Sequence, residues 1–263
     1  MNFPHRKTWL HRINPSLKLI VFVLLFIIIV MIHNINIMIN LTIANLLILF
    51  LFSGHPLRRL LLYSSPFLFI FVSSAAAMMF FGQGETTWVK WGLLHITEES
   101  FYRGLHIGFR ALNFAAVGLL FALTTSPVKL FYSLMQQLKL PPKFSYSFMA
   151  GIRLIPIMFE EFQTLRHAAK VRGGLEGRGL RSLYKKIRFY TVPLLAQSIR
   201  RAQRIAVAME AKRFGMESKR TYYYIISYSW YDLLYLILLA AAVSFAYSAG
   251  LGMPYFDITD VRA

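Results

Sequence analysis

Residues 17–33, LKLIVFVLLFIIIVMIH, are almost wholly apolar and decide the class of fold. A second apolar run, residues 37–52, follows after only the short polar link Asn34-Ile35-Asn36. With its flanks, each run approaches the roughly 20 residues that a helix needs to span a bilayer. The two runs therefore predict a tight membrane hairpin. Because the first run is long and lacks a small-residue cleavage site, it reads as a retained span and not as a signal peptide.

Three further apolar runs predict three more spans, at about residues 60–81, 101–123 and 224–248. The third span contains Pro66, and the fourth carries Arg103 and Arg110. The whole chain of 263 residues is 57% hydrophobic and 16% aromatic, well above the content of an ordinary soluble domain. The sequence thus predicts an all-α integral membrane protein with about five transmembrane helices.

The basic residues predict how these spans are oriented, because cytoplasmic loops carry an excess of Lys and Arg. Basic residues precede the first span and separate the second from the third: Arg6, Lys7, Arg12, Lys18, Arg58 and Arg59. The loop of residues 82–100 has the opposite balance, with Glu85, Glu98 and Glu99 against Lys90, and its Trp88 and Trp91 suit a membrane interface. We therefore expect a cytoplasmic N-terminus and an external loop at residues 82–100.

Residues 128–220 hold most of the charge of the protein. They contain 19 Lys and Arg against 5 Glu, in a chain whose formal net charge is +18. Apolar residues recur there at helical spacing, first at Phe131, Leu134, Met135 and Leu138, and later at Leu195, Ile199, Ala202, Ala206 and Met209. The pattern predicts a cytoplasmic domain of long amphipathic helices between an N-terminal membrane domain, residues 1–127, and a C-terminal span with a short tail, residues 221–263.

Two helical runs in this block end in similar clusters. Residues 152–170 pass Pro156 and lead into HAAKVRGGLEGRG, residues 167–179, while the later run ends in AVAMEAKRFG, residues 206–215. Glycines after a helical run are typical of a C-terminal cap, so one such cluster alone indicates only a helix end and a basic loop. Its repetition favours a shared function. An arginine at a helix end can bind carboxylates or backbone carbonyls of another protein as a planar fork.

Several stretches, taken together, resemble the transmembrane T subunit of energy-coupling factor (ECF) transporters along nearly the whole chain. They are LHRINPSLKL at residues 10–19, SGHPLRRLL at 53–61, LTTSPVKL at 123–130, FMAGIRLIP at 148–156, AAKVRGG at 168–174, and AVAMEAKRFG. The resemblance implies two Ala-Arg-Gly-type motifs that dock on two ATPase subunits. We call them the first cap motif (Val171, Arg172, Gly173) and the second cap motif (Ala211, Lys212, Arg213).

Both cap motifs depart from the family pattern. In the first, Val171 replaces a small residue, while the arginine and glycine are present. In the second, Lys212 stands in the place of the arginine and Arg213 in that of the glycine, and Gly215 follows. The sequence leaves open which of these two cations docks, and lysine offers a point charge without the planar fork.

The resemblance also implies a function. It indicates a non-catalytic coupling subunit, without cofactor, of a vitamin or metal importer in the bacterial cell membrane. Such a subunit passes the ATP-driven movement of two ABC ATPases to a substrate-binding membrane S subunit. In this family specificity belongs to the S subunit, so a vitamin, a thiamine precursor, cobalt and nickel all stay open, as does a dedicated or shared S subunit.

An enzyme acting on phosphorylated lipids or nucleotides is a weaker interpretation. It would need acidic residues to hold Mg²⁺ or act as a base, and the charged block has only the scattered Glu160, Glu161, Glu176, Glu210 and Glu217. The stretch GGLEGRG lacks the Lys-Ser/Thr ending of a phosphate-binding P-loop. The seven histidines form neither HExxH nor a close pair, and the absence of cysteine excludes thiolate nucleophiles and cysteine-bound metals.

Two other classes explain less of the sequence. A basic protein binding anionic lipid or nucleic acid would use residues 178–188, RGLRSLYKKIR, which suit lipid headgroups in a supporting role. That function leaves the paired cap motifs unexplained, and we expect no nucleic-acid partner. A complete secondary transporter would show repeats in corresponding halves, whereas these spans are split unevenly around one charged block.

A few polar residues in or near the spans have simpler interpretations. His5 and His11 are expected at the membrane interface, and His106 in helix packing. We expect Arg110 to brace the packing of the spans, although an intramembrane charge can also mark a transport pathway. Asp232, near the start of the last span, is expected at the interface as a partner of nearby basic residues.

Overall fold

The computed structural model describes residues 8–82, 86–91, 94–173, 179–214, 221–252 and 254–256. These residues form two compact units: the span unit, Met1–Ser126 with Ile226–Ala263, and the arm unit, Pro127–Ile225. Some residues of the sequence predictions lie outside the described residues: His5, Arg6, Lys7, Glu85, Gly174, Glu176, Arg178, Gly215 and Glu217. The side chains of Trp88, Lys90 and Trp91 are likewise not described.

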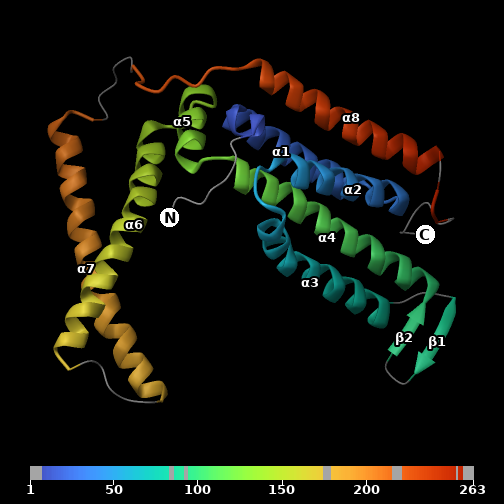
Figure 1. Cartoon of the computed structure of the whole chain (residues 1–263), viewed down its shortest axis with the longest axis horizontal. Helices are drawn as coiled ribbons and strands as arrows, with labels where there is room; N and C mark the ends of the chain where they lie inside the picture. The colour runs from blue at the N-terminus through green and yellow to red at the C-terminus, as the bar shows by residue number, and fades with distance from the viewer. Residues whose placement is uncertain are drawn as a thin grey trace. The chain divides into compact units, whose positions relative to one another are not determined.

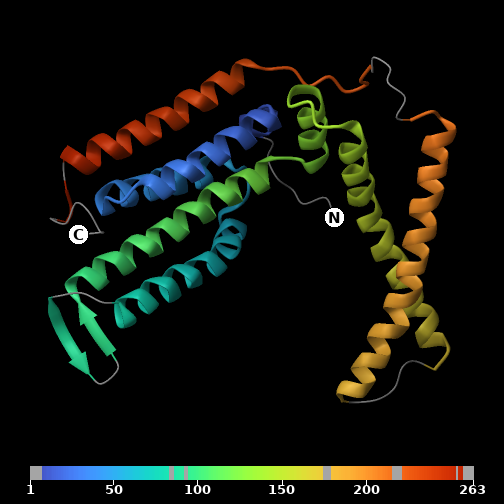
Figure 2. The same cartoon turned by 180° about the vertical axis from the view of Figure 1, so that it is seen from behind.

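The span unit consists of a short 3-10 helix and five apolar helices (Figures 1 and 2). They are η1 (Trp9–Arg12), α1 (Pro15–Met31), α2 (Ile35–Phe52), α3 (Leu57–Phe81), α4 (Glu98–Thr124) and α8 (Trp230–Gly252). The last four of these are long and apolar enough to cross a membrane, whereas α1 is apolar but has 17 residues. At 1.5 Å per residue α1 extends about 25 Å, slightly less than the hydrocarbon core of a bilayer. The prediction of a helical integral membrane protein is confirmed.

One element departs from the all-α prediction. Residues 82–100 contain an antiparallel hairpin of β1 (Thr87–Trp91) and β2 (Leu94–Thr97), with Val89 opposite Ile96. Its first strand is Thr-Trp-Val-Lys-Trp, which is rich in the β-branched and aromatic residues that favour strands. At its end, Thr97 accepts a hydrogen bond from the backbone N–H of Ser100 at 3.2 Å, and its own N–H donates to Ser100 Oγ at 3.0 Å. This reciprocal cap sets the start of α4.

Helices α3 and α4 pack closely because α4 carries glycines where they meet. A Cβ atom on Gly104 would lie 2.7 Å from the carbonyl oxygen of Ala75, and one on Gly108 would lie 2.8 Å from the ring of Phe71. Small residues of this kind let helix backbones approach in a membrane, where apolar burial gives little driving force between helices. On the same helix, a Cβ atom on Gly118 would have no atom within 4 Å.

We expect Gly104→Ala to destabilise the span unit by about 1–3 kcal/mol, because the new methyl group meets a backbone oxygen that can move only with its helix. Gly118→Ala is the matched control in the same helix, and it should be neutral or stabilising by up to about 1 kcal/mol. Thermal unfolding of the purified protein in detergent measures both variants. Equal midpoints for the two variants would contradict close packing at Gly104.

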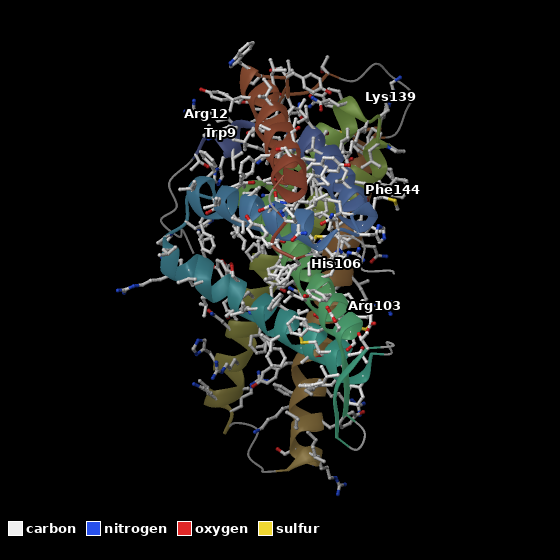
Figure 3. The ribbon with its side chains drawn as sticks, turned by 90° about the vertical axis from the view of Figure 1, so that its right-hand side faces the viewer. Trp9, Arg12, Arg103, His106, Lys139 and Phe144 are labelled. Atoms are coloured by element: carbon white, nitrogen blue, oxygen red, sulfur yellow. The ribbon has the colours of Figure 1, made fainter. Side chains whose placement is uncertain are left out.

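Buried polar side chains join the helices of the span unit. The amide of Asn45 donates to Asn113 Oδ1 at 2.6 Å, which links α2 to α4. Arg110 of α4 donates to the carbonyl oxygen of Ile32 at 2.9 Å, so it satisfies the C-terminal end of α1 and braces packing as expected. His106 is buried and lies one turn from Arg103 on α4 (Figure 3).

Helix α8 begins at Trp230, six residues later than the predicted start of the last span. Its first turn is set by Asp232, whose Oδ2 accepts a hydrogen bond from the N–H of Ser229 at 2.7 Å. Only 3% of Asp232 is exposed, and Oδ1 accepts from the N–H of Asn14 at 2.7 Å. Asp232 was expected to be a partner of nearby basic residues, and the structure adds that its carboxylate is buried and holds two backbone amides.

The arm unit consists of α5 (Pro127–Gln137), α6 (Pro142–Val171) and α7 (Leu180–Ala211). Helix α6 starts ten residues before the predicted run, because Pro142 occupies the first helical turn, where proline needs no N–H partner. Pro156 and Pro193 lie inside α6 and α7 without ending them. Lys139, with φ of 53°, lies in the turn from α5 to α6, and Phe144 lies in the first turn of α6 (Figure 3).

Candidate docking site

The first cap motif ends α6 in an ordinary glycine cap. Val171 is the last helical residue, and Arg172 is the C-cap, with φ of −85° and ψ of 18°. Gly173 follows with φ of 93°, the left-handed conformation that glycine adopts without strain, and its N–H donates to the carbonyl of Lys170 at 3.3 Å. Val171 is 88% exposed, and Arg172 is exposed as well. The motif therefore forms the open tip of the helix.

The second cap motif ends α7 in the same way without a glycine. Lys212 is the C-cap, with φ of −85° and ψ of 13°, and Arg213 takes the left-handed position, with φ of 52°. The N–H of Arg213 donates to Glu210 at 2.8 Å, and that of Phe214 donates to Met209 at 2.9 Å. These two bonds form a Schellman motif. A left-handed residue with a side chain costs about 1 kcal/mol relative to glycine.

The backbone of the two caps sets their register. Lys212 occupies the position of Arg172, with nearly identical dihedral angles, and Arg213 occupies the position of Gly173. The sequence did not decide between the two cations of the second motif. The cap geometry pairs Lys212 with Arg172, and both side chains are exposed at the C-terminal ends of long helices.

Helices α6 and α7 cross near their middles (Figures 1 and 2). Glu161 of α6 forms an ion pair with Arg201 of α7, and Ser198 Oγ donates to the sulfur of Met158 at 2.8 Å. Arg172 follows Glu161 by as many residues as Lys212 follows Arg201. At 1.5 Å per residue, each cap lies about 16 Å along its helix from the ion pair. The two C-caps thus lie at equal distances along their helices from the ion pair.

Sequence patterns did not indicate the Glu161–Arg201 pair, which we call the crossing pair. The side chain of Arg201 is only 26% exposed, and that of Glu161 is 21% exposed. The equal spacing from each member of the pair to its cap becomes apparent only once the structure shows the pair.

The arms also leave apolar surface uncovered. A groove of about 830 Å³ lies between α5, α6 and α7. Its lining is mostly apolar and includes Val128, Tyr132, Met149, Ile152, Ile205 and Met209. Exposed apolar side chains continue along the helices at Phe148, Ile155, Phe159, Leu195, Ile199 and Val207. Apolar surface on this scale marks a site of protein or membrane contact.

A second, basic groove lies on α7 beside its cap motif. It is lined by Arg200, Gln203, Arg204, Val207, Ala208 and Ala211. Within the ranges that the structure describes, no three His, Asp or Glu side chains gather into a possible metal site. The chemistry of these surfaces is that of binding proteins: cations at two helix tips, a basic groove beside one of them, and an apolar groove between the arms.

Comparison with known proteins places the chain. A family model described as a cobalt transport protein, CbiQ, matches residues 6–223. A protein of Listeria innocua serovar 6a named energy-coupling factor transporter transmembrane protein EcfT is 31% identical over 242 residues, which cover 89% of this chain and 91% of the relative. A relative of the same name from Macrococcus caseolyticus is 26% identical over 249 residues, with the same two coverages.

A third relative of that name, from Streptococcus equi, is 27% identical over 246 residues, covering 87% of this chain and 88% of its own. The matches thus run along nearly the whole chain, through the span unit and the arm unit, and they confirm the resemblance that the sequence motifs indicated. The chain belongs to the CbiQ family of cobalt transport proteins.

Proposed function

We propose that this protein is the transmembrane coupling subunit of an ECF-type importer in the bacterial cell membrane. It binds two ABC ATPases through its cap motifs and passes their ATP-driven movement to a substrate-binding membrane S subunit. The observation that carries the proposal is the pair of equivalent caps, Arg172 and Lys212, at equal distances from one helix crossing. Two similar ATPases require two similar docking tips, and the relatives named as energy-coupling transmembrane proteins support the same role.

The chemistry of the caps suits docking into an acidic or carbonyl-lined groove. Arg172 extends from the C-terminal end of a helix, where a guanidinium can form two parallel hydrogen bonds to a carboxylate. Ala211, next to Lys212, is small enough to allow close approach of the partner. Val171 is larger, and its exposed methyl groups add apolar contact at the first tip.

The apolar surfaces of the arm unit have a different partner from the cap motifs. The apolar groove and the exposed apolar side chains of α6 and α7 are the surface for the S subunit, since most of the side chains that line the groove are apolar. The excess of Lys and Arg before the first span and after the second supports a cytoplasmic N-terminus, and the excess in residues 128–220 supports a cytoplasmic arm unit. The protein itself is non-catalytic, and its cargo is a vitamin or a metal ion.

Co-purification tests the proposal. The tagged chain is expressed with a pair of ABC ATPases from the same bacterium and is extracted from membranes in mild detergent. We expect two ATPase subunits to purify with each chain and to hydrolyse ATP. A well-folded chain that retains no ATPase would exclude the coupling function and leave a basic membrane protein with two capped helices.

We further propose that Lys212 is the docking cation of the second cap motif. Arg213→Gly should then retain the ATPases and raise the free energy of unfolding by about 1 kcal/mol, because glycine relieves the left-handed strain. Lys212→Ala should weaken docking at α7 without this gain in stability. ATPase retention and thermal unfolding measure both effects. Loss of an ATPase from the Arg213→Gly variant would show that Arg213 is the docking group.

A further inference from the structure

The two connections between the units reach the same buried place in the span unit. The chain leaves that unit after α4, which ends at Thr124, and returns to it shortly before α8. Four polar residues meet there, and we call them the root cluster: Asn14, Lys18, Thr124 and Asp232. None is more than 4% exposed.

Lys18 of α1 holds the end of α4. Its Nζ donates to the carbonyl oxygen of Thr124 at 3.2 Å and to Thr124 Oγ1 at 2.9 Å. The same hydroxyl donates to the carbonyl of Leu120 at 2.6 Å, so both of its hydrogen-bonding roles are used. The last turn of α4, from which the chain leaves for the arm unit, is therefore fastened to the first turn of α1.

Asp232 fastens the returning chain to the same helix. Its carboxylate accepts hydrogen bonds from the N–H groups of Asn14 and Ser229, and its charge interacts with that of Lys18. The side chain of Asn14 in turn caps α1 by accepting from the N–H of Ser16 at 3.1 Å. Nearby, Arg12 donates to the hydroxyl of Tyr231 at 3.4 Å. The start of α1 is thus fastened to the start of α8 as well.

Joining three helices through such a cluster requires charged groups to be buried, which is unfavourable in free energy. Burying an ammonium group and a carboxylate costs several kcal/mol each before their contacts offset it, and apolar packing would often hold the helices as well. Hydrogen bonds between fixed donors and acceptors, however, define one geometry and resist displacement along the helices. The root cluster places this directional contact at both points where the chain passes between the units.

We propose that the root cluster is the junction through which movement of the arm unit enters the membrane helices, with α1 as the receiving element. This inference rests on the proposed function, in which the bound ATPases move the arm unit. A pull on either connection acts on Thr124 or Asp232, and both transmit it to the first turn of α1. Lys18, Thr124 and Asp232 are then positioning residues for coupling, beyond their part in stability.

Spin labels can test this because the chain has no cysteine. Cysteines replace Met31 at the end of α1, which is 67% exposed, and Phe81 at the end of α3, which is 71% exposed. The labelled protein is assembled with its ATPases in nanodiscs, and the distance between the labels is measured without nucleotide and with ATP and vanadate. We expect the wild-type background to show a nucleotide-dependent shift and the Lys18→Met variant to lose it while still retaining ATPases.

Three variants separate coupling from stability. Asn113→Ala removes a buried hydrogen bond between α2 and α4 away from the connections, and it should keep the shift. Lys18→Arg keeps the cation and should keep the shift too. Thr124→Val removes the hydroxyl that accepts a hydrogen bond from Lys18 and leaves the backbone carbonyl acceptor in place. This variant should reduce the shift, and it replaces Lys18→Met in the test if that variant does not fold.

The outcomes distinguish the two proposals. If the wild-type background retains no ATPase, the proposed function fails, and this inference fails with it. If the ATPases bind but the labels show no shift in the wild-type background, the inference alone is overturned. It is also overturned if Lys18→Met keeps the shift, or if Asn113→Ala loses it equally.

Discussion

Reversing the charge of both cap cations, in an Arg172→Glu, Lys212→Glu variant, is expected to release both ATPases from the membrane subunit. Truncating one partner of a buried interface charge pair costs 2–5 kcal/mol or more. A cost of about 2 kcal/mol at each tip weakens each contact about 30-fold. The ATPase retained per tagged chain after extraction from membranes measures the effect. Thermal unfolding should be unchanged, because both side chains are exposed and substitutions at such sites seldom alter stability.

The single variants sharpen this prediction. Arg172→Glu alone should release the ATPase bound at α6, and Lys212→Glu alone the one bound at α7, so each should retain one of two subunits. Lys185→Glu is the control for the second cap motif, since Lys185 is an exposed cation near the start of α7, at the other end of that helix from Lys212. If Lys185→Glu releases the ATPases as fully as the cap variants do, general charge and not docking at the caps holds the complex.

The membrane helices could be predicted from the sequence because a helix that lies in lipid needs a long run of apolar residues, and such runs are visible in the sequence. The run at residues 17–33 became α1, Pro15–Met31, and the run at residues 37–52 became α2, Ile35–Phe52. Proline residues were a less certain indicator of where a helix begins or ends. The pair Pro141-Pro142 ends one helical pattern, but Pro142 also suits the first turn of the next, so the start of α6 was placed too late.

The register of the second cap motif could not be predicted, because it depends on backbone angles. Sequence rules expect glycine in the left-handed position after a helix, and here that position holds Arg213. Gly215, the only glycine near this helix end, lies outside the described residues. The hydrogen bonds of Arg213 and Phe214 to the last turn of α7 show that Arg213 takes the left-handed position of this cap.

Contacts between distant residues were also beyond a single sequence. Asp232 lies in a predicted span end with basic residues nearby, and nothing local shows that it meets the backbone of Asn14. Nothing local to Glu161 or Arg201 shows that they pair, because they lie 40 residues apart in the sequence and on separate helices. Pairing of this kind follows from how α6 and α7 cross.

The crossing pair yields the second large prediction. We expect Glu161→Arg to disrupt the two-ATPase complex, because it places a second cation beside Arg201 at a contact where both side chains are largely covered. The caps stay intact, but the repulsion changes the angle between the arms and so the separation of the two tips. Arg201→Glu should do the same through two carboxylates. ATPase retention, and the ATP hydrolysis of whatever complex remains, measure each loss.

The charge-swapped double variant, Glu161→Arg with Arg201→Glu, decides whether the pair acts through its geometry. It restores an ion pair at the same position and should recover most of the lost assembly, with an interaction energy of about 1–3 kcal/mol in the double-mutant cycle. The neighbouring exposed residues Glu160 and Arg200 provide the control, because swapping their charges one position along each helix likewise leaves the net charge unchanged. If ATPase retention recovers only in the Glu161→Arg, Arg201→Glu double variant, docking at the two caps depends on the angle at which α6 and α7 cross. No recovery would mean that the arms are positioned by other contacts, such as that of Ser198 with Met158.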